Sequence, residues 1–155
     1  EQEDYREKGV KCEPEPNNNI KKNSYYYINM LKIFKKKKKD KITDFKLNHP
    51  YEKRFAESNR IICKYPERVP IICQRINNEV PQIDRTKYLC PRDLSMANFM
   101  LVIRKRLQLS PEKALYLFVA NKIVPCSQLL GTVYEEKKDE DGFLYINYAG
   151  ESTFG

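Results

Sequence analysis

One amphipathic segment with two β-rich segments on either side restricts this chain to a small set of architectures. Residues 96–107 repeat apolar side chains at spacings of three and four, which is typical of a helix with one buried face. Ser95 precedes this run and is a favoured helix N-cap, and basic residues near its end suit the negative end of the helix dipole. The sequence therefore predicts a capped helix that packs across a sheet.

The flanking segments predict four short strands. Residues 69–75 and 86–90 are rich in β-branched, aromatic and other apolar residues, and their closeness predicts a hairpin. Residues 115–119 and 143–148 follow the helix, with a short helix predicted over 127–134 between them. Two strands, a covering helix and two more strands form the order of the ubiquitin-like β-grasp, an α+β fold.

The part of the chain before the first strand divides into two regions. Apolar residues at helical spacing after Pro50 predict a further helix over residues 50–63. Residues 1–43 instead contain runs of asparagine, tyrosine and lysine without sustained periodicity, which is typical of disorder. We therefore expect a disordered basic tail over 1–43 and a β-grasp domain with additional N-terminal helices over 44–155.

The residue inventory argues against several classes of protein. The longest apolar run is about half of the roughly 20 residues that a membrane-spanning helix needs. Five cysteines are an odd number and include no CxxC pair, which disfavours a disulfide framework or a zinc site. No secretory signal is visible at the start of the sequence, so we expect a cytoplasmic protein.

Nothing in the inventory indicates catalysis, a metal or a cofactor. The single histidine, His49, has no neighbouring nucleophile, and the five glycines are not spaced as a phosphate-binding loop. The acidic residues at 135–136 and 139–141 are interleaved with lysines, which we interpret as a solvated hairpin-like turn. We expect a protein that is not an enzyme.

The net charge is compatible with a polyanionic partner or with an anionic membrane surface. Lys and Arg number 29 against 21 Asp and Glu, a formal charge of +8, and a lysine run occupies residues 35–39. A nucleic-acid partner bound by this run would show steep salt dependence. The run by itself is weak evidence, because most such runs are solvated, so nucleic acid is the least favoured partner.

The final residue, Gly155, indicates a specific chemistry. A terminal glycine has no Cβ, so its carboxylate can enter a narrow enzymatic channel, be adenylated, pass to a cysteine as a thioester and reach an amine. Gly155 occupies this position after the last predicted strand. In a β-grasp domain this arrangement favours a conjugated modifier.

Short motifs spread in order over residues 44–155 resemble a known family. They are Phe45-Lys46, His49-Pro50-Tyr51-Glu52-Lys53-Arg54, Lys64-Tyr65-Pro66-Glu67-Arg68-Val69-Pro70, Lys87-Tyr88-Leu89, the segment 99–106, Tyr134-Glu135-Glu136 and Asp141-Gly142-Phe143-Leu144-Tyr145. In type and spacing they are similar to the autophagy-related ubiquitin-like modifiers, the family that includes GABARAP. The tail 1–43 has no counterpart in that family.

The resemblance implies a lipid-conjugated modifier that acts in autophagosome formation. Activating and conjugating enzymes would join Gly155 to the amine of phosphatidylethanolamine, and no cofactor would stay bound. The lipidated protein would sit on an autophagosome, a related vesicle or another organelle membrane. If Gly155 is not the natural end of the chain, the alternative is a peptide-binding adaptor of the same fold without conjugation.

The resemblance also implies docking of cargo receptors and adaptors through short motifs of an aromatic residue, two spacers and an aliphatic residue. The pocket for the aromatic residue would be lined by Glu57, Ile61, Pro70, Lys87, Leu89 and Phe143. The pocket for the aliphatic residue would be lined by Tyr88, Cys90, Pro91, Leu94, Phe99 and Val102. Acidic residues flanking the motif would be attracted by Arg68, Arg85, Lys87 and Arg106.

The chain departs from the family pattern at three places. The loop over residues 76–84 is one residue shorter than in GABARAP, which affects the placement of Arg85. Cys90 and Val102 differ in shape from the usual apolar residues, so we expect a slightly different aliphatic preference. Ala149-Gly150, before the final segment, is smaller than usual.

Overall fold

The computed structural model describes residues 45–151 of this chain. The predicted tail 1–43 and Gly155 lie outside the described residues.

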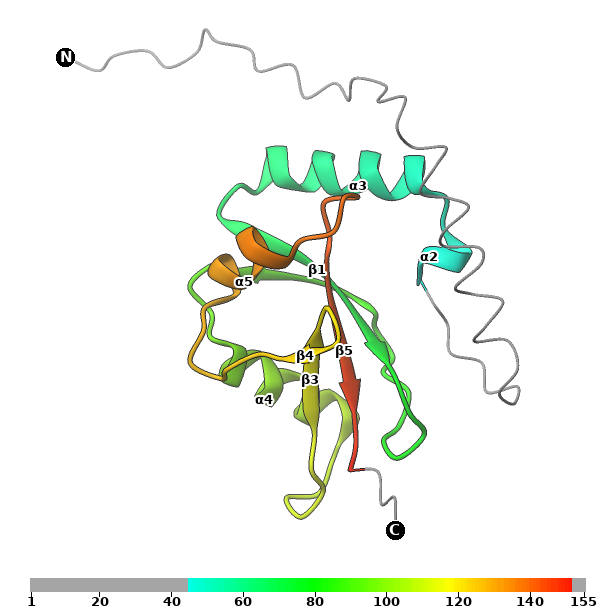
Figure 1. Cartoon of the computed structure of the whole chain (residues 1–155), viewed down its shortest axis with the longest axis vertical. Helices are drawn as coiled ribbons and strands as arrows, with labels where there is room; N and C mark the ends of the chain where they lie inside the picture. Colours follow the sequence, from blue (N-terminus) through cyan, green and yellow to red (C-terminus); the bar gives the residue numbers. More distant parts are fainter. Residues whose placement is uncertain (1–44, 152–155) are drawn as a thin grey trace, which may run out of the picture. The chain divides into compact units, whose positions relative to one another are not determined.

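The described part is an α+β fold with helices before a mixed sheet (Figure 1). In chain order the elements are α2 (Phe45–Asn48), α3 (Tyr51–Lys64), β1 (Arg68–Arg75), β2 (Lys87–Pro91), α4 (Met96–Leu107), β3 (Tyr116–Val119), β4 (Lys122–Ile123), α5 (Leu130–Lys137) and β5 (Leu144–Ala149). This confirms the ubiquitin-like fold class and the helices before the first strand.

The sheet has the strand order β2-β1-β5-β3-β4. β1 pairs antiparallel with β2 and parallel with β5, and β5 pairs antiparallel with β3. Pro70 lies opposite Leu89 of β2, and pairing of β1 with β5 starts one residue later, at Ile71. The missing Pro70 N–H therefore costs no ladder bond to β5.

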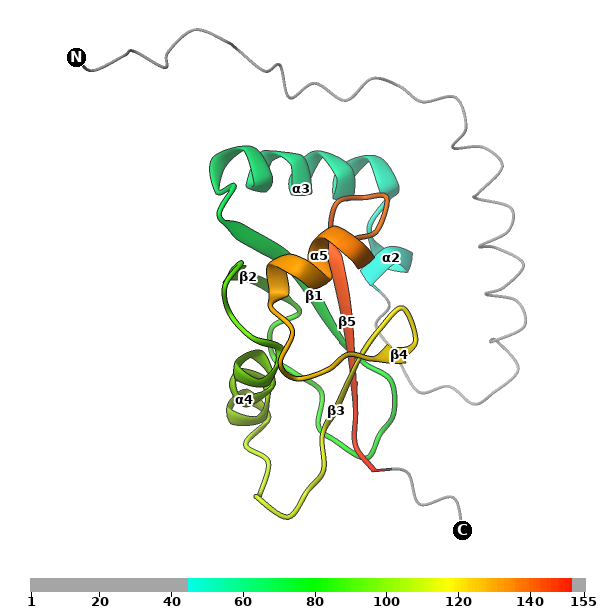
Figure 2. The ribbon, with the colours of Figure 1, turned by 60° about the vertical axis from the view of Figure 1, so that its left-hand side comes forward.

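Alternate residues of the central strands build two apolar layers. Ile71 of β1 and Ile146 of β5 belong to the larger core, which also contains Phe99 of α4 and Val133 of α5. Ile72, on the opposite side of β1, packs in a second cluster with Phe45 and Phe143. In Figure 1 and Figure 2 α3 and α4 lie apart, with β1 and β5 between them.

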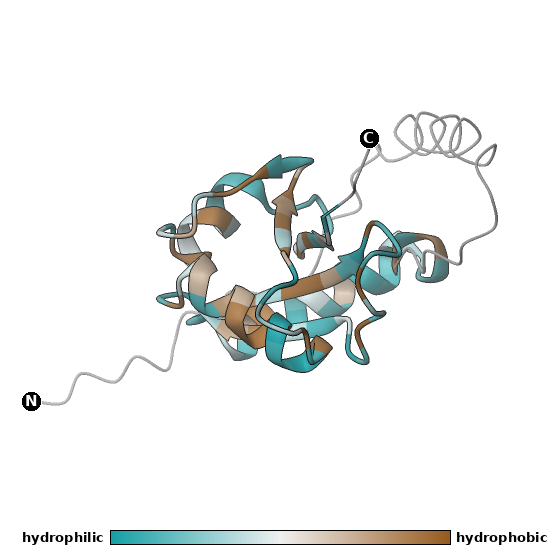
Figure 3. Cartoon of the chain, turned by 90° about the horizontal axis from the view of Figure 1, so that it is seen from below, coloured by the Kyte–Doolittle hydropathy of each residue, from teal (hydrophilic) through white to brown (hydrophobic). Residues whose placement is uncertain are grey.

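Hydrophobic residues are concentrated in the helices and strands rather than in the loops. In Figure 3 hydrophobic residues follow the strands, and hydrophilic residues occupy most of the connecting loops. The strand side chains Ile71, Leu144 and Ile146 are fully buried. The central strands therefore form the interior against which the helices pack.

The ends of α4 follow the predicted capping chemistry. The Ser95 Oγ accepts the Asn98 N–H at 3.2 Å, which satisfies one of the free donors of the first turn. At the other end Gln108 adopts a left-handed conformation with φ 52°, and its N–H reaches the carbonyls of Arg104 and Lys105. The predicted helix and its cap are confirmed.

Three local elements differ from expectation. α2 and β4 were not predicted, because four and two residues are too short to show a period. α5 begins at Leu130, three residues later than the predicted start at Ser127. The reason is a turn after Pro125, whose carbonyl accepts the Gln128 N–H at 3.1 Å, so this segment is held outside the helix.

The prediction of a solvated turn for the acidic segment before β5 is wrong. Asp141 is fully buried rather than part of a solvated turn, and its carboxylate pairs with the guanidinium of Arg54 on α3. The same carboxylate accepts the Tyr145 hydroxyl at 2.6 Å and the Phe143 N–H at 3.0 Å. Glu135 and Glu136 lie in α5 instead of a hairpin-like loop.

This buried ion pair joins α3 to the start of β5. The Arg54 Nε donates to the His49 carbonyl at 3.0 Å, and Ser58 Oγ bonds the Asp141 carbonyl. Gly142 has φ +83°, and a Cβ there would meet Ser58 Oγ at 2.5 Å. Burial and the hydrogen bond to Asp141 raise the pKa of Tyr145, so its hydroxyl stays protonated and donating.

Candidate functional site

The candidate site lies along β2, which is an edge strand of the sheet. β1 pairs with one side of β2, and no strand of the described chain pairs with the other. An unpaired strand edge offers backbone donors and acceptors that an extended peptide can meet. Alternate residues of β2 face opposite sides of the sheet, so alternate side chains of a peptide bound at this edge would contact different sets of residues.

The six residues predicted for the aromatic pocket lie on the α3 side of the β1–β2 pair, where the structure shows contacts between some of them. Leu89 is half-buried and lies opposite Pro70 across the strand pair. Ile61 of α3 packs against the cluster that contains Phe143, which is fully buried. Phe143 therefore forms part of the floor beneath the more exposed members of the set.

An ion pair lies at the mouth of this pocket. The Lys87 Nζ lies 2.7 and 3.0 Å from the two carboxylate oxygens of Glu57. The same ammonium lies 5.3 Å from the centre of the Phe45 ring, and that ring packs edge-on against Phe143. Phe45 is a residue that sequence reasoning did not assign to the site, because α2 is too short to predict.

The residues predicted for the aliphatic pocket lie on the other side of β2, except Pro91, which alternates to the same side as Leu89 and is exposed. Tyr88 packs edge-on against Phe99 of α4, with ring centres 5.7 Å apart. Cys90 and Leu94 pack against the main core, while Val102 is 42% exposed on the outer side of α4. The set therefore runs from a buried aromatic floor to an exposed aliphatic rim.

Burial sets the protonation of the two titratable groups in this second pocket. It raises the pKa of the Cys90 thiol to about 11, with Arg68 opposing the shift, and it raises the pKa of Tyr88. Both side chains are therefore neutral at pH 7. The pocket combines an uncharged interior with cations outside it.

The predicted electrostatic residues differ in how far they are already paired. The Arg68 Nη1 lies 3.5 Å from the Leu89 carbonyl, which places its cation beside β2. Arg106 pairs with Asp84 at 3.1 Å and lies 5.8 Å from the centre of the Tyr88 ring. Arg85 is exposed. An acidic peptide would thus compete with Asp84 for Arg106.

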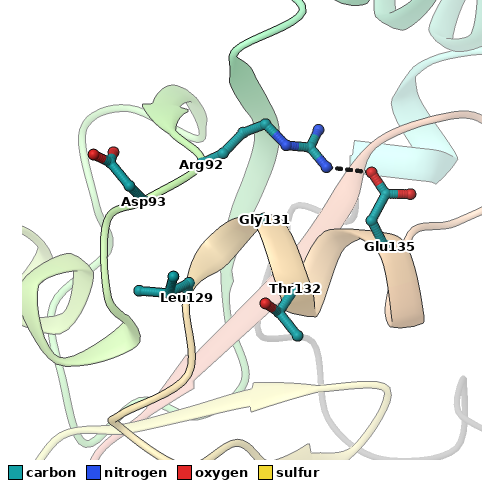
Figure 4. Close-up of a pocket in the computed structure, with 6 residues that line it drawn as sticks. All are labelled: Arg92, Asp93, Leu129, Gly131, Thr132 and Glu135. Carbon is teal, nitrogen blue, oxygen red and sulfur yellow. Dashed lines mark hydrogen bonds and ion pairs between the residues drawn. The ribbon is translucent and has the colours of Figure 1, made fainter.

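A surface pocket of about 410 Å³ lies away from the predicted aromatic pocket, at the start of α5. Figure 4 shows Arg92 reaching across this helix to Glu135, with which it forms an ion pair. Leu129, Gly131 and Thr132, at the start of α5, also line this pocket. None of these residues was predicted as a site residue.

The described residues contain neither a cluster of metal-ligating side chains nor a helix long and apolar enough to cross a membrane. β5 ends at Ala149, and the last described residue, Glu151, is exposed. The predicted attachment residue, Gly155, is four residues further on.

Known proteins resemble this chain in sequence over most of its described length. Residues 53–155 match the family described as autophagy protein Atg8, ubiquitin like. Autophagy-related protein 8d of Arabidopsis thaliana is 54% identical over 115 residues, which cover 74% of this chain and 96% of that protein. Autophagy-related protein 8A of Oryza sativa subsp. japonica is 54% identical over 114 residues, which cover 73% of this chain and 96% of that protein.

A solved structure gives the same fold. The crystal structure of Trypanosoma brucei ATG8 superposes with a TM-score of 0.67 at 39% identity, covering 76% of this chain and all of that one. The chain therefore belongs to the Atg8 family of autophagy proteins, which are non-enzymatic ubiquitin-like modifiers.

Proposed function

We propose that the domain 44–155 is a modifier that is conjugated through Gly155 to phosphatidylethanolamine and that binds partners with aromatic-x-x-aliphatic motifs. The observation that carries this proposal is the free edge of β2, together with an apolar cluster on each side of the sheet beside it. Family membership supports both activities.

Peptide binding would add a strand to the sheet. The backbone of an extended peptide would pair with β2, and its aromatic and aliphatic side chains would pack on the apolar clusters on the α3 and α4 sides. The ion pair between Lys87 and Glu57 would open or shift as the aromatic ring enters, freeing the ammonium for an acidic flank of the peptide. This accounts for both the apolar and the charged parts of the site.

Conjugation would use the glycine carboxylate. The carboxylate of Gly155 attacks the α-phosphorus of ATP and releases pyrophosphate, and an enzyme thiolate then displaces AMP to form a thioester. After transfer to a second enzyme cysteine, the amine of phosphatidylethanolamine attacks the carbonyl, the thiolate leaves and an amide remains. The absence of a Cβ at Gly155 keeps the reacting carbonyl accessible in each step.

Together the two proposed activities would place the protein at a membrane. The lipid would hold the domain on an autophagosome or a related vesicle, and the β2 groove would bring cargo receptors and adaptors to that surface. The cationic side chains beside the groove, Arg68, Arg85 and Arg106, would speed encounter with acidic partners.

Intact mass tests the conjugation half of the proposal. The chain is incubated with ATP, phosphatidylethanolamine liposomes and activating and conjugating enzymes that process the Arabidopsis thaliana relative. We expect a mass gain equal to one phospholipid minus water, and no gain without ATP. No gain from this chain, while the relative is lipidated, would instead support the alternative of a peptide-binding adaptor without conjugation.

Reversing the charge at Lys87 should weaken binding of an acidic-flanked peptide. The substitution Lys87→Glu replaces a cation 2.7 Å from Glu57 by an anion, which removes one attraction and adds repulsion. We expect a loss of about 1 to 3 kcal/mol in binding free energy by isothermal titration calorimetry. Lys122→Glu, the same change on β4 at the opposite sheet edge, should leave the affinity unchanged. If wild type, Lys87→Glu and Lys122→Glu bind the peptide with equal affinity, Lys87 is not part of the binding site.

Filling the aromatic pocket should block the peptide without unfolding the domain. Leu89→Arg places a longer, charged side chain at a half-buried position of the edge strand. We expect the dissociation constant to rise at least about 30-fold, since a central apolar contact is lost. Ile123→Arg on the exposed β4 is the matched control. A collapsed circular dichroism spectrum of Leu89→Arg would show that Leu89 serves the core instead of the peptide.

A further inference from the structure

One side chain holds the base of the C-terminal segment. The Asn77 Nδ2 donates to the Gly150 carbonyl at 3.1 Å, and the Gly150 N–H donates to Asn77 Oδ1, also at 3.1 Å. Both backbone polar groups of Gly150 are thus satisfied by one amide that is 73 residues away in sequence. Two bonds to one planar group fix the orientation of the peptide as well as its position.

The contact extends the parallel ladder between β1 and β5. The last strand pair is Arg75 with Tyr148, and the next N–H, of Ile76, donates to the Tyr148 carbonyl at 2.9 Å. Counting two residues further on each strand brings Asn77 opposite Gly150. The Asn77 side chain therefore supplies the hydrogen bonds that the backbone of a longer β1 would have made.

The loop after Asn77 encloses Gly150 from the other side. Gly150 is buried, and a Cβ on it would lie 2.8 Å from the Glu79 Cβ and 2.9 Å from the Val80 Cγ1. Val80 is 2% exposed, so it has little room to move. Asn77, Glu79 and Val80 together form what we call the clasp. Its close fit requires glycine at position 150.

The clasp is fixed to the end of β5 by further bonds. The Tyr148 hydroxyl donates to the Pro81 carbonyl at 3.1 Å and accepts the Ile83 N–H at 2.8 Å. Arg75 donates to the Val80 carbonyl at 3.1 Å. Because the loop is tied at several points, the clasp can hold Gly150 against motion of the residues that follow it.

We propose that Asn77 is a positioning residue for conjugation: its amide holds Gly150 so that the C-terminal segment leaves the domain at one fixed point. This inference rests on the proposed conjugation of Gly155. With the clasp closed, residues 151–155 follow Gly150, and when extended they reach about 17 Å. Opening the clasp would release at least Gly150 as well, and the enzyme would have to order a longer segment.

Loss of the clasp should therefore raise the Michaelis constant for the modifier more than it lowers the turnover rate. An activating enzyme that binds an already oriented segment spends less binding free energy on ordering the chain. In Asn77→Ala both bonds to Gly150 are lost. We expect KM to rise about tenfold and kcat to stay within about twofold.

The experiment compares wild type, Asn77→Ala, Asn77→Asp and Asn78→Ala. Asn78 is exposed and adjacent, so its variant is a control for removal of an asparagine from the same loop. Asn77→Asp keeps an acceptor for the Gly150 N–H but loses the donor to its carbonyl, and should give an intermediate KM. If Asn77→Ala does not fold, Asn77→Asp provides a folded variant in which one of the two bonds is lost.

Two measurements are made on each protein. Amide hydrogen exchange by NMR reports the Gly150 N–H, and ATP-dependent thioester formation on the activating enzyme gives KM and kcat. Exchange at Gly150 should be at least about tenfold faster in Asn77→Ala and unchanged in Asn78→Ala. The affinity for an aromatic-x-x-aliphatic peptide, measured alongside, should be equal in all four.

The outcomes separate the two proposals. Faster exchange with a higher KM supports the positioning role. An unchanged Gly150 exchange rate, or faster exchange with an unchanged KM, overturns it while conjugation of the wild type still stands. If the wild type forms no thioester while the Arabidopsis thaliana relative does, the proposed conjugation fails and the positioning role fails with it.

Discussion

Replacing Gly155 by alanine is expected to lower the initial rate of lipid conjugation at least about 100-fold. The substituted carbon is bonded directly to the reacting carbonyl, so the added methyl group lies where AMP, the enzyme thiols and the lipid amine must approach in turn. It also restricts the backbone angles that glycine can adopt in a narrow channel. A displacement of about 1 Å at a reacting centre is enough for a loss of this size.

The rate is measured by intact mass at early times, with the enzymes in excess over the modifier. Thr153→Ala, a change of similar size two residues earlier, serves as the control and should conjugate at a rate within about fivefold of wild type. Peptide affinity should be equal in all three proteins, because the β2 groove does not include these residues. Normal lipidation of Gly155→Ala would mean that another group is the attachment point.

Replacing Asp141 by asparagine is expected to destabilise the domain by about 3 to 5 kcal/mol. The Asp141 side chain is fully buried and that of Arg54 is 9% exposed, so water cannot replace the lost carboxylate. The amide keeps the shape but leaves a guanidinium without a counter-charge, and it weakens the acceptor for the Tyr145 hydroxyl. The free energy of unfolding is read from urea denaturation.

Glu135→Gln is the matched control for this prediction. Glu135 also forms an ion pair with an arginine, Arg92, but the two side chains are 56% and 35% exposed. Solvent screens that pair, and its loss should cost less than about 1 kcal/mol. Equal losses in the two variants would contradict the distinction between the buried and the exposed pair.

The fold was predictable where local patterns are long. The twelve residues of α4 repeat apolar side chains over three turns and begin at a capping serine, so the helix and its buried face follow from sequence. α2 and β4 are too short for any period, and they form because tertiary contacts hold them. The start of α5 was misplaced because backbone bonds from residues 126–128 to α4 override local helix preference.

The candidate groove was predictable only through the family resemblance. Composition and periodicity indicate that β2 is a strand, but they do not show that it is the sheet edge or that Glu57 meets Lys87. Asp141 was misinterpreted because it stands in a charged run, while its partner Arg54 is 87 residues away. Asn77 gives no sequence signal, since its role depends on a register that only the folded sheet defines.

Liposome flotation joins both proposed activities in one measurement. The protein is lipidated on phosphatidylethanolamine liposomes, mixed with a fluorescent aromatic-x-x-aliphatic peptide and centrifuged through a density gradient. With wild type, protein and peptide should float together. Gly155→Ala should leave both at the bottom although it binds the peptide in solution, and Leu89→Arg should float without peptide.

Either of two results would contradict the proposed function. Peptide that floats with Leu89→Arg would show that the β2 groove is not the recruiting surface. Wild-type protein that stays at the bottom with its peptide, while the lipidated Arabidopsis thaliana relative floats, would show that this chain is not joined to the membrane through its C-terminal glycine.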